Sequence, residues 1–139
     1  MPALERTTCR DLAAAARVGR LATVTPAGHP HAVPVCFAVV GDTIVSAIDG
    51  KPKSTTRLQR IDNLRTHPDA ALLVDHYDDD WLQLWWVRID AHVDIVADHD
   101  AGLDALTEKY AQYADAPPGG PFLVLHPDRW TGWAYARSE

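Results

Sequence analysis

Two of the three lysines in this chain, Lys51 and Lys53, lie directly before a segment whose pattern predicts a helix. Ser54 follows them and can cap that helix, and Arg57 falls within its first turn. Amides of a first helical turn have no acceptor inside the helix and lie at the positive end of its dipole, so they bind anions such as phosphate. The pattern therefore predicts an anion site, and the alternative is a solvated basic face with an ordinary helix cap.

The five tryptophans form a second group of interest. Trp86 and Arg88 fall on the polar face of a strand expected from about residue 82 to 96, whereas Trp85 falls on its apolar face. An indole on a polar face needs a partner, so Trp86 could stack on a planar ligand or lie in a subunit interface. The alternative is a ring that lies flat over neighbouring strands of its own sheet.

Other kinds of site chemistry have weaker support. His29 and His31 flank a proline at a turn, and residues 78–80 form an acidic run, but neither group has the ligand spacing of a zinc or calcium site, so we expect no metal. Cys9 and Cys36 lack redox or metal spacing and are expected to be free thiols. No Gly-x-Ser-x-Gly motif occurs, so hydrolysis through a covalent intermediate is not expected and no catalytic residue is assigned.

The composition limits the size and partners of the protein. At 139 residues and 47% hydrophobic, the chain predicts a single domain, 1–139, with its own core. The net charge is -6, with +4 in the first 68 residues and -10 in the rest, which argues against nucleic-acid binding because a polyanion requires an extended basic surface. No apolar run reaches bilayer length and no signal pattern opens the chain, so we expect a cytoplasmic protein with no membrane partner.

The hydrophobic periodicity predicts about seven strands and three short helices. The helices are expected at 8–17, capped by Thr8, at 54–67 and at 99–113. The strands are expected at 21–25, 31–40, 43–48, 70–76, 82–96, 122–125 and 129–136, the last two separated by a turn at 126–128. The segment 31–40 is apolar on both faces, which predicts an interior strand. Dense strands without alternating helices favour a small antiparallel barrel.

With these elements in order, the chain resembles the split-barrel flavoproteins related to pyridoxamine 5'-phosphate oxidase. Residues 20–35 resemble the first hairpin of that family, and residues 51–68 resemble its phosphate-binding loop and helix. Lys51-Pro52-Lys53, together with the run from Val74 to Trp81 that leads into Leu84–Arg88, is similar to an actinobacterial branch that uses the deazaflavin coenzyme F-420. The chain lacks the fuller arginine and lysine pattern of the pyridoxamine oxidases themselves, which argues against that specific activity.

The resemblance implies a mainly β (α+β), FMN-binding-like split β-barrel that forms a homodimer with cofactor sites at the subunit interface. It implies cofactor contacts from three groups: Lys51, Lys53, Ser54 and Arg57 at the phosphate; Val33, Pro34, Val35, Cys36, Ala47, Ile48 and Asp49 beside the ring; and Trp86, Arg88 and Trp133 from the partner subunit. The implied activity is hydride transfer from reduced F-420 to an unsaturated or conjugated small organic acceptor. Two alternatives remain, an FMN-dependent oxidoreductase of the same fold and a non-catalytic module that binds a flavin, haem or another anion.

Overall fold

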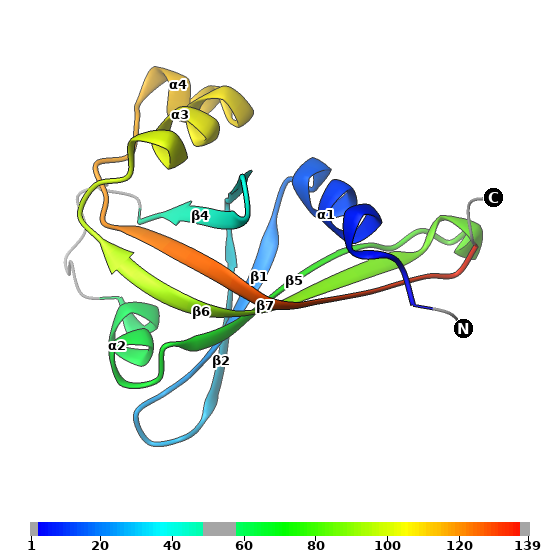
Figure 1. The fold of residues 1–139 in the computed structure, drawn as a ribbon, viewed down its shortest axis with the longest axis horizontal. Helices are drawn as coiled ribbons and strands as arrows, with labels where there is room; N and C mark the ends of the chain where they lie inside the picture. Colours follow the sequence, from blue (N-terminus) through cyan, green and yellow to red (C-terminus); the bar gives the residue numbers. More distant parts are fainter. Residues whose placement is uncertain (1–2, 49–57, 137–139) are drawn as a thin grey trace.

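The computed structural model describes residues 3–48 and 58–136. Seven strands pair antiparallel in one sheet, in the order β2-β1-β5-β6-β7-β4-β3 (Figure 1). The strands are β1 Gly19–Val24, β2 Pro30–Val35, β3 Ala38–Val40, β4 Thr43–Ala47, β5 Asp69–His76, β6 Trp85–Val96 and β7 Phe122–Ala134. The helices are α1 Arg6–Ala15, α2 Gln59–Thr66, α3 Asp100–Lys109 and α4 Ala111–Asp115, with a short 3-10 helix, η1, at Trp81–Gln83. No helix of the described residues is long and apolar enough to cross a bilayer.

The sheet curls so that its two edges meet. β2 and β3 are the edge strands, although only Cys36 and Phe37 separate them in the chain. The three steps from Val35 to Ala38 span at most about 11 Å, so the edges must approach one another here. Ser46 Oγ on β4 donates to the Cys36 carbonyl oxygen at 2.7 Å, which ties the link to the opposite edge. The architecture is the predicted split barrel, mainly β with helices around it.

The edge position of β2 and β3 contradicts the prediction of one interior strand over 31–40. The apolar residues of this segment fill the corner between two edge strands instead, and Phe37 at the break is fully buried. Pro30 and Pro34 were the signal for an edge, because a proline cannot donate to a ladder and is tolerated best where one side of the strand is unpaired. An apolar pattern on both faces does not distinguish these two cases.

One face of the sheet, here called the inner face, holds the main core. The strand registers align Leu21, Leu72 and Ile89 in one row, and each is at most 1% exposed. The predicted alternation of β6 is confirmed, since Val87, Ile89, Ala91 and Val93 are buried while His92 and Asp94 are exposed. Burial of this period-2 stripe is the main force that holds the strands together.

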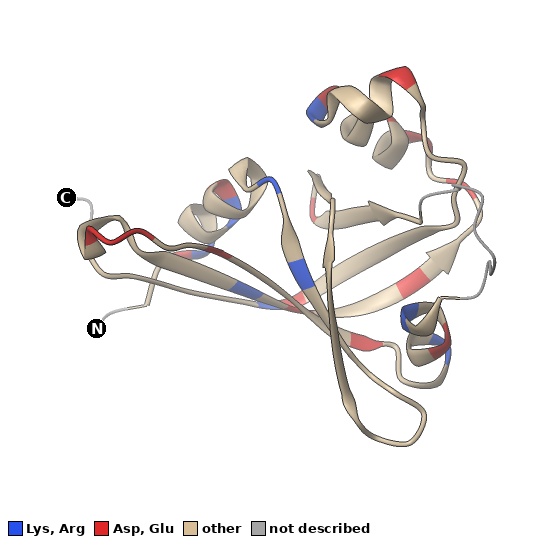
Figure 2. Cartoon of the chain, turned by 180° about the vertical axis from the view of Figure 1, so that it is seen from behind, with Lys and Arg blue, Asp and Glu red and all other residues tan. Residues whose placement is uncertain are grey.

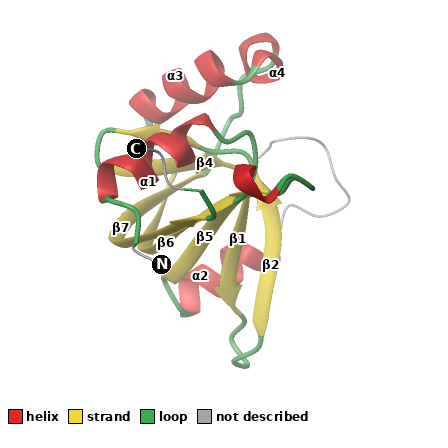
Figure 3. Ribbon diagram, turned by 90° about the vertical axis from the view of Figure 1, so that its right-hand side faces the viewer, coloured by secondary structure: helices red, strands yellow, loops and turns green. Residues whose placement is uncertain are grey.

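Two helices pack on the inner face, at opposite ends (Figure 3). Cys9 of α1 lies against Gly132 of β7 so closely that a Cβ at Gly132 would come within 2.6 Å of the Cys9 Sγ. At the other end, Asn63 of α2 donates to Thr23 Oγ1 of β1 at 2.9 Å, and both side chains are buried. α3 packs on β3 and β4 instead, with Gly102 against Val45.

The helix starts differ from the predicted caps. α1 begins at Arg6 without a side-chain cap, so Thr8 is not its N-cap; the Leu4 N–H bonds to the Gly132 carbonyl at 3.1 Å and sets where the chain turns into the helix. α2 begins at Gln59 after an extended Leu58, with φ -103° and ψ 139°, so it does not start at Ser54. The third predicted helix is divided into α3 and α4 at the extended residue Tyr110.

The predicted turn at 126–128 is also wrong, because β7 continues through it. The register with β6 shifts between Asp90 and Ala91, where Arg129 and Pro127 are the partners and Asp128 has none. Such a bulge accommodates a proline inside a strand and bends the strand locally. The sheet thus gains one long β6–β7 ladder, which extends away from α3 and α4 as an arm (Figure 1).

Candidate functional site

The face of the sheet opposite the core, here called the outer face, carries the polar side chains of β1, β5, β6 and β7. The registers align Pro34, Arg20, Leu73, Arg88 and Thr131 in one row across five strands. The contacts of α1 with Gly132 and of α2 with Thr23 lie on the inner face, and Leu73 is 38% exposed. The outer face is therefore open to solvent or to a partner.

Trp86, Arg88 and Trp133 lie together on this outer face, and we call them the tryptophan platform. Trp86 and Trp133 are direct partners across β6 and β7. The Arg88 guanidinium carbon lies 6.0 Å from the Trp86 ring centroid, and its Nε is 3.5 Å from an Asp90 carboxylate oxygen. Arg88 Nε and Thr131 Oγ1 are buried atoms without a hydrogen-bond partner among the described residues. The platform thus combines flat aromatic surface with polar atoms that a ligand or partner could satisfy.

The two segments expected beside a cofactor ring come together where the two edges of the sheet approach each other. We call this region, residues 33–36 and 46–48, the barrel edge. The Ser46–Cys36 hydrogen bond places residues 33–36 next to residues 46–48, and the Ile48 N–H donates to the Pro121 carbonyl at 2.9 Å. Val35, Ala47 and Ile48 are each only 7% exposed. Val33 pairs with Leu21 of the inner row, so its side chain faces the core, and this region offers a ligand mainly its backbone, Pro34 and the half-buried Cys36.

The platform and the barrel edge do not form one site within a single chain. Pro34 and Arg88 share a row of the outer face, but β1 and β5 lie between them, which separates them by roughly 14 Å at normal strand spacing. The remaining predicted contacts, Asp49, Lys51, Lys53, Ser54 and Arg57, lie outside the described residues. The structure therefore groups the predicted residues into two surfaces that only a second subunit or a large ligand could join.

Arg60, in the first turn of α2, is a candidate that the predicted site did not include. Its Nε is buried without a hydrogen-bond partner in the described part of the chain, and burial lowers its pKa, an effect that nearby Tyr113 partly offsets. A desolvated guanidinium with an unused donor at a helix N-terminus fits an anionic group such as phosphate. Its position three residues after Arg57 in the basic segment was the available sequence signal.

A second half-buried cation, Lys109, lies at the β2–β3 link. Its Nζ donates to the Phe37 carbonyl at 2.8 Å and lies 4.0 Å from the Phe37 ring centroid. Burial, and to a smaller degree Arg17, lowers the pKa of Lys109 to about 8, while Cys36 acts in the opposite direction. The Tyr110 hydroxyl accepts from the Phe37 N–H at 3.1 Å and lies 3.0 Å from the Arg17 carbonyl. These contacts hold the corner that positions Cys36.

Figure 2 shows that the lysine and arginine positions of the described residues are spread over several strands and helices, with acidic positions among them. No group of three or more His, Cys, Asp or Glu side chains with metal-site geometry occurs in the described ranges. The acidic run at 78–80 serves its own loop: the Asp78 carboxylate accepts from the Asp80 N–H at 2.7 Å, and the Asp80 carboxylate accepts from the Leu82 N–H at 3.1 Å.

Comparisons with known proteins agree with this fold. A family model described as pyridoxamine 5'-phosphate oxidase matches residues 6–134. An FAD-binding protein from Mesorhizobium loti is similar with a TM-score of 0.69 and 21% identity, over 94% of this chain and 95% of that one. A haem-binding protein from Mycobacterium smegmatis has a TM-score of 0.73 and 21% identity, over 94% of this chain and 55% of that one. At these identities the likeness shows the fold alone.

An F-420 reductase is similar with a TM-score of 0.63 and 25% identity, over 87% of this chain and 94% of the reductase. No curated protein matches the chain.

Proposed function

The chain belongs to the pyridoxamine 5'-phosphate oxidase family, and on that premise we propose that it is an oxidoreductase that uses reduced coenzyme F-420 to reduce an unsaturated or conjugated small organic molecule. The family match over residues 6–134 is the observation that carries the proposal. The similarity to an F-420 reductase favours this cofactor over FMN. We also propose that the protein is located in the cytoplasm.

We propose that the active form is a homodimer in which the tryptophan platform of one subunit faces the barrel edge of the other. Three observations support this arrangement. Leu73 on the outer face is partly exposed, the two surfaces are too far apart within one chain, and large apolar side chains are exposed at the end of the arm, in the β5–β6 connection and just after β7. Those side chains are Tyr77, Trp81, Leu82 and Tyr135, which are between 43% and 68% exposed. Exposed aromatic residues gathered on one projection are typical of an interaction surface.

The described residues fit a cofactor with an anionic tail and a flat ring. Arg60 and the N-terminus of α2 would bind the phosphate, with Lys51 and Lys53 as further contacts that the sequence predicts. The platform would offer the ring an aromatic surface and shield it from water. When bound, reduced F-420 supplies the hydride, so the side chains have the task of orientation and no described residue is assigned as an obligatory acid or base.

Calorimetric titration of the purified protein with F-420, FMN and haem tests the proposal. We expect F-420 to bind saturably and at least ten times more tightly than FMN, and menadione to accelerate the oxidation of reduced F-420 in the presence of the protein. Tighter binding of FMN would favour the FMN-dependent alternative, and binding of haem alone would favour a non-catalytic module. Absence of saturable binding by both F-420 and FMN would refute an oxidoreductase of either kind.

Substitutions test the anion site separately. Arg60→Gln should weaken F-420 binding about tenfold, because a hydrogen bond to a charged group contributes roughly 1.5 to 3 kcal/mol. Arg65→Gln, on the exposed last turn of the same helix, is the matched control and should change affinity less than twofold. Lys51→Ala combined with Lys53→Ala should also weaken binding at least tenfold, and unchanged affinity in both basic variants would exclude this anion site.

A further inference from the structure

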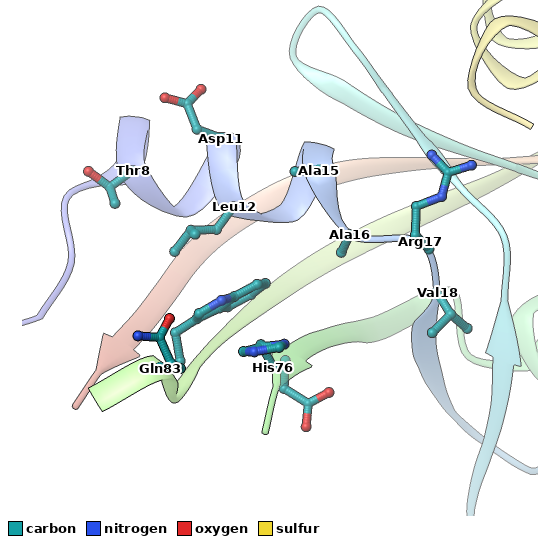
Figure 4. Close-up of a pocket in the computed structure, with 11 residues that line it drawn as sticks. Thr8, Asp11, Leu12, Ala15, Ala16, Arg17, Val18, His76 and Gln83 are labelled. Carbon is teal, nitrogen blue, oxygen red and sulfur yellow. The ribbon is translucent and has the colours of Figure 1, made fainter. Parts of the chain in front are cut away.

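A cleft of about 680 Å³ lies between α1 and the hairpin that joins β5 to β6 (Figure 4). Leu12, Ala15 and Ala16 line it from the helix, and Trp85, His76 and Gln83 line it from the hairpin. Its volume is in the range of small-molecule sites. None of the residues assigned above to the cofactor lines it, so the cleft is separate from the proposed cofactor site.

The cleft forms where the inner face extends beyond the core. Val74 and Val87 are partners in the β5–β6 ladder and are both fully buried. In the next inner-face pair along the ladder, His76 is exposed and Trp85 is half-buried. The helix above them ends at Ala15, and the chain then turns away in an extended conformation. The indole of Trp85 therefore faces the apolar side of α1, and the cleft is the space between them.

The charged residues at the cleft are engaged elsewhere or directed away from it. Arg17 donates to the Lys109 carbonyl at 2.8 Å and lies 4.9 Å from the Tyr110 ring centroid. The Asp75 carboxylate accepts from Arg20 at 2.8 Å. In Figure 4 the Asp11 carboxylate points away from His76 and Gln83. Arg17 is the one arginine or lysine among the described residues that line the cleft, and in Figure 4 it lies at the end away from His76 and Gln83, so an anionic ligand is disfavoured beside those two residues.

The polar groups that remain, His76 and Gln83, lie at the edge. Figure 4 shows Leu12 directed from the helix towards Gln83, with His76 on the same side of the cleft as Gln83. No hydrogen bond of the His76 or Gln83 side chain to another described residue accompanies this arrangement, so their donors and acceptors are available. Two apolar walls with a few polar atoms at the rim are the features that select a flat, mostly apolar ligand.

We propose that this cleft binds a planar, uncharged aromatic molecule, whose ring lies between Leu12 and Trp85 and whose polar edge bonds to Gln83 and His76. Binding here requires neither F-420 nor FMN, so the inference stands apart from the proposed function. A ligand of this kind would bury its ring against the indole and lose little hydration at its edge, whereas a charged ligand would leave an unpaired charge beside apolar walls.

A pair of probes with the same ring tests the charge preference on the full-length protein without cofactor. 2-Naphthol is planar and uncharged, and 2-naphthalenesulfonate carries the same ring with a negative charge. We expect a dissociation constant at least ten times lower for 2-naphthol, with amide and indole NMR shifts confined to α1, Trp85 and the β5–β6 hairpin. Equal affinities, no saturable binding, or shifts centred on the outer face would overturn the proposal.

Two pairs of variants test the location. Ala15→Trp places a large ring at a lining position and should raise the dissociation constant of 2-naphthol at least tenfold, whereas Ala14→Trp, on the neighbouring exposed residue outside the cleft, should leave it within twofold. Gln83→Leu should weaken binding about fivefold, and Gln112→Leu on α4 should not. Circular dichroism establishes that each variant is folded, and equal effects within both pairs would overturn the assignment.

Discussion

The inner and outer faces of β5 and β6 share one hydrogen-bonded ladder but differ in what covers them. On the inner face Leu72 and Ile89 belong to the core and are at most 1% exposed. On the outer face their neighbours Leu73 and Arg88 are partners in the same ladder, and Leu73 is 38% exposed. The strands are held together by the first face and leave the second free for ligands or a partner.

This difference explains why the aromatic residues of the chain have different roles. Trp85 on the inner face packs partly against the core and forms the floor of a cleft, while Trp86, the next residue, belongs to the open platform. Because successive side chains of a strand point to opposite faces, adjacent residues of one type meet different environments. Substitutions of such neighbours are the most direct way to test the comparison.

The largest expected effect is on stability and distinguishes Leu72 from Leu73. Leu72→Ala should lower the free energy of unfolding by about 3 kcal/mol, because it removes buried methyl groups and leaves a cavity against Phe37 and Gly19. Leu73→Ala should lower it by less than about 1 kcal/mol, since the outer side chain is partly solvated. Urea denaturation measures both, and equal losses would contradict the division between the faces.

A smaller loss of stability is expected when the buried hydrogen bond between Asn63 and Thr23 is removed. Asn63 is fully buried and donates to Thr23 Oγ1, so Asn63→Leu should cost about 2 kcal/mol by leaving that hydroxyl unpaired. Gln59→Leu removes the donor to Asn63 Oδ1 but leaves the bond from Asn63 to Thr23 intact, so it should cost less, about 1 kcal/mol. Thermal or urea unfolding provides the measurement, and recovery of stability in Asn63→Leu with Thr23→Val would identify the unpaired hydroxyl as the cause.

The outer face should respond in binding rather than in stability. Trp86→Leu is expected to weaken F-420 binding about tenfold, about 1.4 kcal/mol, through loss of the aromatic surface. Its unfolding free energy should change by less than that amount. Trp86→Phe, which keeps an aromatic ring at the same position, is the control and should retain most of the affinity. Calorimetric titration measures the F-420 affinity of each variant. Unchanged affinity in Trp86→Leu would show that the platform does not belong to the proposed cofactor site.

The smallest expected effect is a pH dependence of the unfolding free energy, which comes from Lys109 at the β2–β3 link. The pKa of Lys109 is lowered to about 8, whereas an unfolded lysine titrates near 10.4. Between these values the unfolded chain binds more protons, so wild-type stability should rise with pH relative to Lys109→Met. Because solvent screens a half-exposed ammonium, the gain from pH 7 to 9.5 should stay below about 1 kcal/mol. Lys109→Arg should show no such rise, and parallel curves for wild type and Lys109→Met would contradict the prediction.

Local patterns in the sequence were enough to predict much of the fold. The alternation along β6 identified its buried face, because side chains of a strand alternate with a period of two whatever the neighbouring strand is. The strand density predicted a small antiparallel barrel, the family resemblance made it a split barrel, and the observed sheet confirms that fold. The grouping of Trp86, Arg88 and Trp133 came from the family resemblance rather than from a local pattern, and the register of β6 and β7 places the three residues on one face.

Only the tertiary structure decided which strands are edges, how α2 begins and which side chains lack partners. Pairing of Leu21 with Leu72 and burial of Arg60 depend on residues far apart in the chain, and no local period encodes that choice. The sequence by itself therefore determined which residues face a core. The curl of the sheet determined what the other residues face: an open platform, a barrel edge and a cleft beneath α1.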